Sequence, residues 1–103
     1  MKRVKWSASE WAEANVRLWD RANDHCEFCG DTLIRSPSAV ERHHRQAKKH
    51  GGPDADHNIA LVHQTCHQWA HANPLAAREL GWIVPSWGDP ATTPITKGKP
   101  WTR

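Results

Sequence analysis

Five side chains able to bind a divalent cation or transfer a proton lie within a short part of this 103-residue chain. Two are adjacent histidines, His43 and His44, and the other three are Cys66, His67 and His71. Neutral imidazole binds metal ions and accepts a proton near pH 7. Hydrolysis of a phosphodiester needs a base that activates water and a cation that stabilises negative charge. The five residues therefore indicate a metal-dependent hydrolytic site.

The spacing of these residues divides them between two sites. His67 and His71 are four residues apart, so on a helix they share one face and bind one ion. Cys66 would point about 100° away from His67 and serve another site. His43 and His44 point to opposite faces of a strand, unless a bulge or a strand end brings both to one site. We assign His43 to the metal and His44 to the base.

A second candidate metal site consists of Cys26-x-x-Cys29 and His63-x-x-Cys66. Zinc prefers four thiolate or imidazole ligands in a tetrahedron, and a structural Zn²⁺ here would cross-link two distant segments. Two alternatives remain open. Cys26 and Cys29 could form a redox pair, although no βαβ pattern surrounds them. His63 could be a plain surface histidine, with Cys66 merely buried.

Local signals predict the elements that position these residues. Ser7 and Glu10 form a capping-box pattern that begins a helix over residues 8–22, with Trp11, Leu18 and Trp19 in the core. Residues 39–44 and 59–62 are predicted to be short strands. Helices are expected over residues 65–72 and 74–80, the first ended by Pro74 and the second by Gly81.

Asn58 lies at the start of the second predicted strand, immediately before Ile59. An asparagine amide can hydrogen-bond across a loop and fix the position of a catalytic strand. The alternative is a turn asparagine with no catalytic role, which is common.

Positive charge surrounds the histidine pair. The chain has a net charge of +3 and a pI of about 9.0, which favours an anionic partner such as DNA. The cations nearest the pair, which we predict to contact phosphate, are Arg42, Arg45, Lys48 and Lys49.

Composition restricts the class of protein. Three cysteines are too few, and odd in number, for a disulfide framework. No apolar run approaches the ~18 residues of a membrane span. The basic arm at residues 1–6 is not followed by the apolar core of a signal peptide. We expect a cytoplasmic protein without membrane contact. One domain is predicted over residues 1–88, followed by an extended, partly flexible tail over residues 89–103.

The segment Glu41-Arg-His43-His44 … Gly51-Gly52 … Asn58-Ile-Ala-Leu-Val … Cys66-His67-x-x-x-His71 resembles the HNH endonucleases. The resemblance covers about residues 26–72 and is strongest to small phage members with a zinc knuckle. It implies an α+β fold with a ββα-metal (His-Me finger) core. We expect this core to carry an N-terminal helix, a structural zinc knuckle and an extended C-terminal tail.

The resemblance also implies roles for single residues. His43 and His67 would bind the catalytic metal, His44 would activate water, and Asn58 would hold the strand and loop together. His71 resembles an extra helical histidine of nuclease colicins and is a further candidate ligand. Glu41 stands where those nucleases have an acidic residue that orients an arginine near phosphate.

Two positions depart from the family pattern. Many members have aspartate where this chain has His43, and the softer imidazole favours Zn²⁺, Ni²⁺ or Mn²⁺ over Mg²⁺. The usual zinc knuckle has four cysteines, whereas His63 replaces one of them here.

The function implied is metal-dependent hydrolysis of DNA phosphodiester bonds, by nicking or double-strand cleavage. A phage origin would add terminase or other packaging proteins as partners and the host cytoplasm as location. Two alternatives remain. One is a zinc-stabilised DNA-binding module without catalysis, and the other is an accessory domain within a packaging complex.

Overall fold

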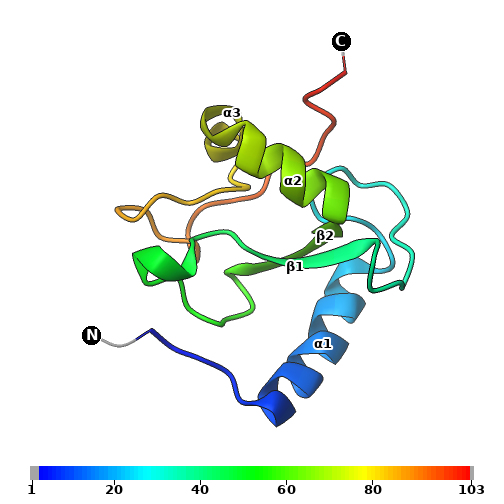
Figure 1. Cartoon of the computed structure of the whole chain (residues 1–103), viewed down its shortest axis with the longest axis vertical. Coiled ribbons are helices and arrows are strands. Elements are labelled where there is room, and N and C mark those ends of the chain that lie inside the picture. The colour runs from blue at the N-terminus through cyan, green and yellow to red at the C-terminus, as the bar shows by residue number, and fades with distance from the viewer. Residues whose placement is uncertain (1–2, 103) are drawn as a thin grey trace.

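Two short antiparallel strands and the helix that follows them form the centre of the structure (Figure 1). The computed structural model describes residues 3–102; Met1, Lys2 and Arg103, which belong to the predicted arm and tail, lie outside the described residues. β1 (Val40–His44) pairs with β2 (Ile59–His63), and α2 (Gln64–Ala72) begins directly after β2. This ββα arrangement confirms the predicted α+β fold class.

Helix α1 (Ala8–Ala22) begins at the predicted capping box. The Ser7 hydroxyl accepts from the Glu10 amide at 3.2 Å, and the Glu10 carboxylate accepts from the Ser7 amide at 2.9 Å. Leu18 and Trp19 are buried as predicted, but Trp11 is only half-buried because it faces an open cleft. Figure 1 shows the strand pair between α1 and α2. No helix in residues 3–102 has the length and apolar character needed to cross a membrane.

The centre of the core is a stacked aromatic pair. Phe28 and Trp82 are both fully buried, with parallel rings whose centroids are 4.4 Å apart. Phe28 lies between the two cysteines of the predicted knuckle, and Trp82 follows α3 (Pro74–Glu79). The Phe28 ring also contacts the His43 ring edge-on, at 5.1 Å between centroids. The core therefore fixes the orientation of a predicted site residue directly.

Arg45 attaches the C-terminal segment to the loop after β1. Its side chain is 5% exposed, and its guanidinium donates to the carbonyls of Gly81 and His57, both at 2.9 Å, and of Pro90 at 3.0 Å. It also donates to the Thr93 carbonyl. The predicted phosphate contact of Arg45 therefore gains no support from the structure, because carbonyl oxygens accept from all three of its guanidinium nitrogens.

Replacing this arginine tests its structural role. We expect Arg45→Lys to lower the free energy of unfolding by about 2–4 kcal/mol, because a lysine ammonium cannot donate to four carbonyls arranged around a planar fork. Urea unfolding measures the loss. The control is Arg35→Lys, at a side chain 61% exposed, which should change stability by less than about 0.5 kcal/mol. A fully stable Arg45→Lys protein would contradict this role.

Candidate functional site

His43 is held inside the protein with one ring nitrogen available. Its Nε2 lies 2.8 Å from the Trp82 carbonyl oxygen, which accepts only, so Nε2 carries the ring proton and Nδ1 keeps its lone pair. The residue is 1% exposed, and burial lowers the pKa of His43 to about 3. The ring is therefore neutral near pH 7, as a metal ligand must be.

Two further histidines lie near this Nδ1, so that three imidazole rings form one cluster. The Nδ1 atoms of His43 and His67 are 2.8 Å apart, and the ring of His71 lies 4.5 Å from that of His67. One nitrogen from each of the three rings lies within 4.8 Å of the others. Two imidazoles at about 2.1 Å from one ion, near a right angle, would be separated by about 3.0 Å. The three residues predicted as ligands therefore fit one divalent cation.

His67 contributes to this cluster from α2, which begins directly after β2. Burial, together with the nearby His71, lowers the pKa of His67. Like His43, it thus favours the neutral form that binds a metal ion.

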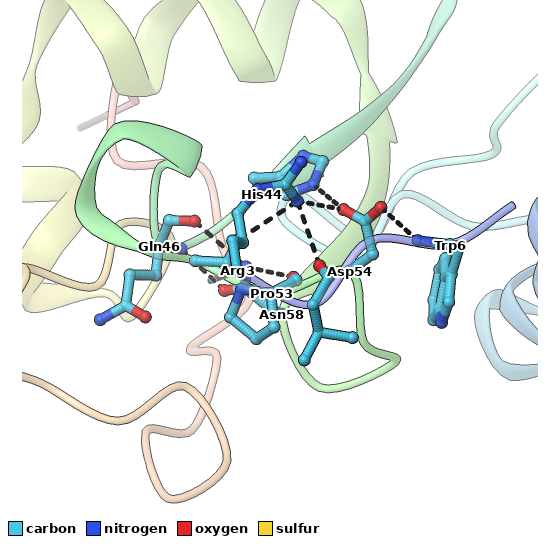
Figure 2. Close-up of polar contacts among 9 residues, drawn as sticks. Arg3, Trp6, His44, Gln46, Pro53, Asp54 and Asn58 are labelled. Carbon is cyan, nitrogen blue, oxygen red and sulfur yellow. Dashed lines mark hydrogen bonds and ion pairs between the residues drawn. The ribbon is translucent and has the colours of Figure 1, made fainter. Parts of the chain in front are cut away.

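The His44 ring turns to the other side of β1, toward the loop between the strands (Figure 2). Its Nε2 lies 2.8 Å from Asp54 Oδ1, and its side chain is 13% exposed. Asp54 carries no recognisable functional signal in the sequence. It is one of two acidic residues, with Asp56, in the polar loop between the strands, and no spacing in the sequence links it to His44.

An open cleft of about 540 Å³ joins the two sides of the strand. Four histidines line it, namely His43, His44, His67 and His71. The other lining residues include Trp11, Glu41, Arg42, Lys48 and Lys49. The strand alternation does not separate the metal cluster from His44, because both border the same cleft.

The four cations predicted to contact phosphate differ in their exposure to solvent. Lys48 and Lys49 are exposed in a short 3₁₀ helix, Lys48–His50, at the rim of the cleft. Arg42 is half-buried and donates from Nε to the Asn15 side chain. Arg45 does not line the cleft, because its side chain is buried against the C-terminal segment.

Asn58 closes the base of the loop between the strands (Figure 2). It is fully buried; its Oδ1 accepts from the Gln46 amide at 2.8 Å, and its Nδ2 donates to the carbonyls of Gln46 at 3.1 Å and Pro53 at 2.9 Å. A Cβ on Gly52 would lie 1.8 Å from the Gln46 carbonyl oxygen, so only glycine fits there. Asn58 thereby fixes the segment that carries Asp54.

The second cluster consists of Cys26, Cys29, His63 and Cys66, whose ligand atoms lie within 4.8 Å of one another. The sulfur atoms of Cys26 and Cys66 are 3.8 Å apart, and His63 Nδ1 lies 3.3 Å from Cys29 Sγ and 3.7 Å from Cys66 Sγ. A tetrahedral Zn²⁺ requires about 3.8 Å between sulfurs and about 3.5 Å between sulfur and nitrogen. The four residues therefore fit zinc.

Polar contacts around the cluster favour the metal-binding forms of two of its residues, His63 and Cys26. The Nε2 of His63 lies 2.9 Å from the Thr32 carbonyl oxygen, which leaves Nδ1 for the ion. The hydrogen bond between Cys26 and Cys66, with those from the amides of Cys29 and His63, lowers the pKa of Cys26 to about 4 although burial opposes this. A stabilised thiolate is the form that binds zinc.

The buried neutral state of His43 predicts a dependence of stability on pH. The folded protein keeps the ring unprotonated down to about pH 3, whereas the unfolded chain binds a proton near the ordinary value of 6.5. The unfolded state thus binds more protons below pH 6.5, so the contribution of His43 is complete above that pH and is lost as pH falls toward 3.

This dependence is measured by urea unfolding from about pH 7.5 to about pH 5.5. Below the ordinary histidine pKa, wild type should lose about 1.4 kcal/mol per pH unit relative to His43→Gln. The difference between the two proteins removes the contributions of the other histidines. Parallel stability curves would show that His43 is not held neutral by burial.

Comparison with known proteins identifies the central part of the chain. The HNH endonuclease family matches residues 26–73, which contain the cysteine cluster, both strands and α2. No curated protein and no solved structure matches the chain. The matched segment carries all residues of the two metal-binding clusters. This chain therefore contains a domain of the HNH endonuclease family over residues 26–73.

Proposed function

We propose that this protein is a metal-dependent endonuclease that hydrolyses phosphodiester bonds of DNA. The observation that carries the proposal is the shared cleft. His44 borders the same 540 Å³ opening as the His43, His67 and His71 cluster. A base and a metal site facing one open space are what hydrolysis of a phosphodiester requires.

In this proposal, each residue of the cleft has a distinct task. His44 accepts a proton from water at Nδ1, since its Nε2 is directed at Asp54. His43 and His67, with His71 as a further ligand, would hold the divalent cation, and Asn58 holds the loop. The cation supplies Lewis-acid stabilisation of charge on the phosphate and the leaving oxygen. Imidazole ligands favour Zn²⁺, Ni²⁺ or Mn²⁺ over Mg²⁺, because Mg²⁺ is the hardest Lewis acid of the four ions.

The cysteine cluster would bind structural Zn²⁺ in the same proposal. Its support is the agreement between the distances of 3.3–3.8 Å among the ligand atoms and a tetrahedral site. Bound zinc would attach the segment after α1 to the start of α2. A domain of this size gains much of its stability from such a cross-link.

Lys48 and Lys49 are the strongest candidates for phosphate contacts, because both are exposed at the rim of the cleft. Arg42 would add a further cation from β1, and Glu41 beside it would orient that guanidinium. Contacts of this kind position a DNA backbone without reading its sequence.

A second candidate function lacks cleavage: the chain would be a zinc-stabilised DNA-binding module or an accessory domain of a packaging complex. The observation that favours it is the independence of the cysteine cluster, which shares no residue with the histidine cluster. Zinc at the cysteine cluster could then stabilise a DNA-binding module even if the histidine cluster in the cleft binds no metal ion. Packaging proteins as partners and the host cytoplasm as location rest on the resemblance to phage members.

Plasmid nicking separates the two functions. We expect wild type to relax supercoiled DNA with at least one of Mg²⁺, Mn²⁺, Ni²⁺ and Zn²⁺, and His44→Ala to lower the rate about 10²–10⁴-fold, the range of a general base. His25→Ala is the control, since His25 is exposed outside the cleft. Equal rates for wild type and His44→Ala would remove His44 as the base.

The dependence of DNA binding on salt tests the phosphate contacts. Replacing Lys48 and Lys49 by alanine should weaken binding and reduce the slope of log affinity against log salt by up to about 2. Lys99→Ala is the control, because Lys99 pairs with Asp31 away from the cleft. Wild-type affinity that does not change between low and moderate salt would contradict the role of these lysines.

A further inference from the structure

Asp54 receives three hydrogen bonds although it lies in the loop between the strands (Figure 2). Its Oδ1 accepts from His44 Nε2 at 2.8 Å and from Arg3 Nη1 at 2.7 Å, and its Oδ2 accepts from the Trp6 amide at 2.8 Å. The residue is 4% exposed. An acidic side chain this buried is uncommon unless its charge is satisfied, and here both oxygens have donors.

The donors other than His44 come from a segment outside the family match. Arg3 and Trp6 precede α1, whereas the HNH match begins at residue 26. The contact is reciprocal, since the Asp54 amide donates to the Val4 carbonyl at 2.8 Å. The Arg3 guanidinium is 14% exposed and also lies 3.4 Å from the Gly52 carbonyl oxygen. Residues 3–6, which lie outside the matched segment, therefore hold the loop between β1 and β2 in place.

The charge of Asp54 determines which nitrogen of His44 carries the proton. Burial opposes ionisation, but the hydrogen bonds from His44, the Trp6 amide and Arg3 outweigh it and lower the pKa of Asp54 to about 2. A carboxylate only accepts, so the proton on Nε2 of His44 is directed at Asp54. The Nδ1 atom is then unprotonated on a residue that lines the cleft. Asp54 itself does not line the cleft.

We propose that Asp54 is the positioning residue of His44, and that Arg3 and the Trp6 amide hold Asp54 in place. Residues 3–6 thus complete the active site, although they lie outside the HNH domain. This inference rests on the proposed function, in which His44 activates water. Asp54 acts through His44 and does not contact the substrate.

Kinetics of nicking with the zinc-loaded full chain test this role. Asp54→Ala should lower kcat about 10²-fold with KM within about threefold, since an unheld base loses its orientation and its proton-accepting tautomer. Arg3→Ala should lower kcat about tenfold and is the variant less able to disturb folding. Lys5→Ala is the matched control, because Lys5 is an exposed cation of the same arm and should leave kcat unchanged.

The double variant separates positioning from a general loss of structure. If Asp54 acts only through His44, His44→Ala combined with Asp54→Ala should be no slower than His44→Ala alone. Losses that multiply in the double variant would overturn the proposal. So would Asp54→Ala and Arg3→Ala proteins that retain wild-type kcat.

A spectroscopic readout makes the inference independent of activity. Long-range ¹H–¹⁵N spectra of the zinc-loaded protein should show His44 protonated at Nε2, with signals assigned by their loss in His44→Gln. Arg3→Ala and Asp54→Ala should shift the ring toward a mixture of tautomers. If wild type fails to nick DNA, the proposed function fails, and these spectra still decide whether Asp54 fixes the ring. An unchanged His44 spectrum in both variants would overturn the inference.

Discussion

The structure depends on the junction between β2 and α2, where two adjacent residues face different clusters. Cys66 lies with the other cysteines and His63, whereas His67 lies with His43 and His71. A helix turns about 100° per residue, so neighbouring side chains on α2 must diverge. Because α2 starts directly after β2, nothing flexible separates the two clusters. Strands of five residues gain little stability alone, and metal ligands at this junction would fix the helix against the sheet.

Strand β1 divides its two histidines in the same way, and backbone or loop acceptors then determine their chemistry. His43 donates from Nε2 to a buried carbonyl, and His44 directs Nε2 at a buried carboxylate. Both rings thereby leave Nδ1 available, that of His43 toward the metal cluster and that of His44 on a residue that lines the cleft. The proposed ligand His43 and the proposed base His44 are thus distinguished by what each ring faces, since residue type and tautomer are the same.

Much of this arrangement could be predicted because its signals are local. The capping box at Ser7 and Glu10 places α1 at residues 8–22 as predicted, and both strands differ from their predicted bounds by one residue. Short spacings in the sequence reveal the pairs Cys26–Cys29, His63–Cys66 and His67–His71, whereas the fold joins them into the two clusters of the structure. The partners of His43 and His63 are carbonyls, which have no side-chain signature. In sequence, Arg45 is a cation of the same polar loop as Lys48 and Lys49. Its burial depends on the backbone carbonyls of residues 57, 81, 90 and 93, which only the folded chain brings around its side chain.

The most direct test of the account is a Co²⁺ titration of the metal-free protein, followed by absorption spectroscopy. We predict two ions per chain, one with thiolate-to-metal bands from the cysteine cluster and one without them. Cys29→Ser should weaken the thiolate bands and unfold the chain, whereas His67→Asn should remove only the second ion and leave the fold intact. Binding that saturates at one ion per chain, or loss of both ions in His67→Asn, would contradict two separate sites on one helix.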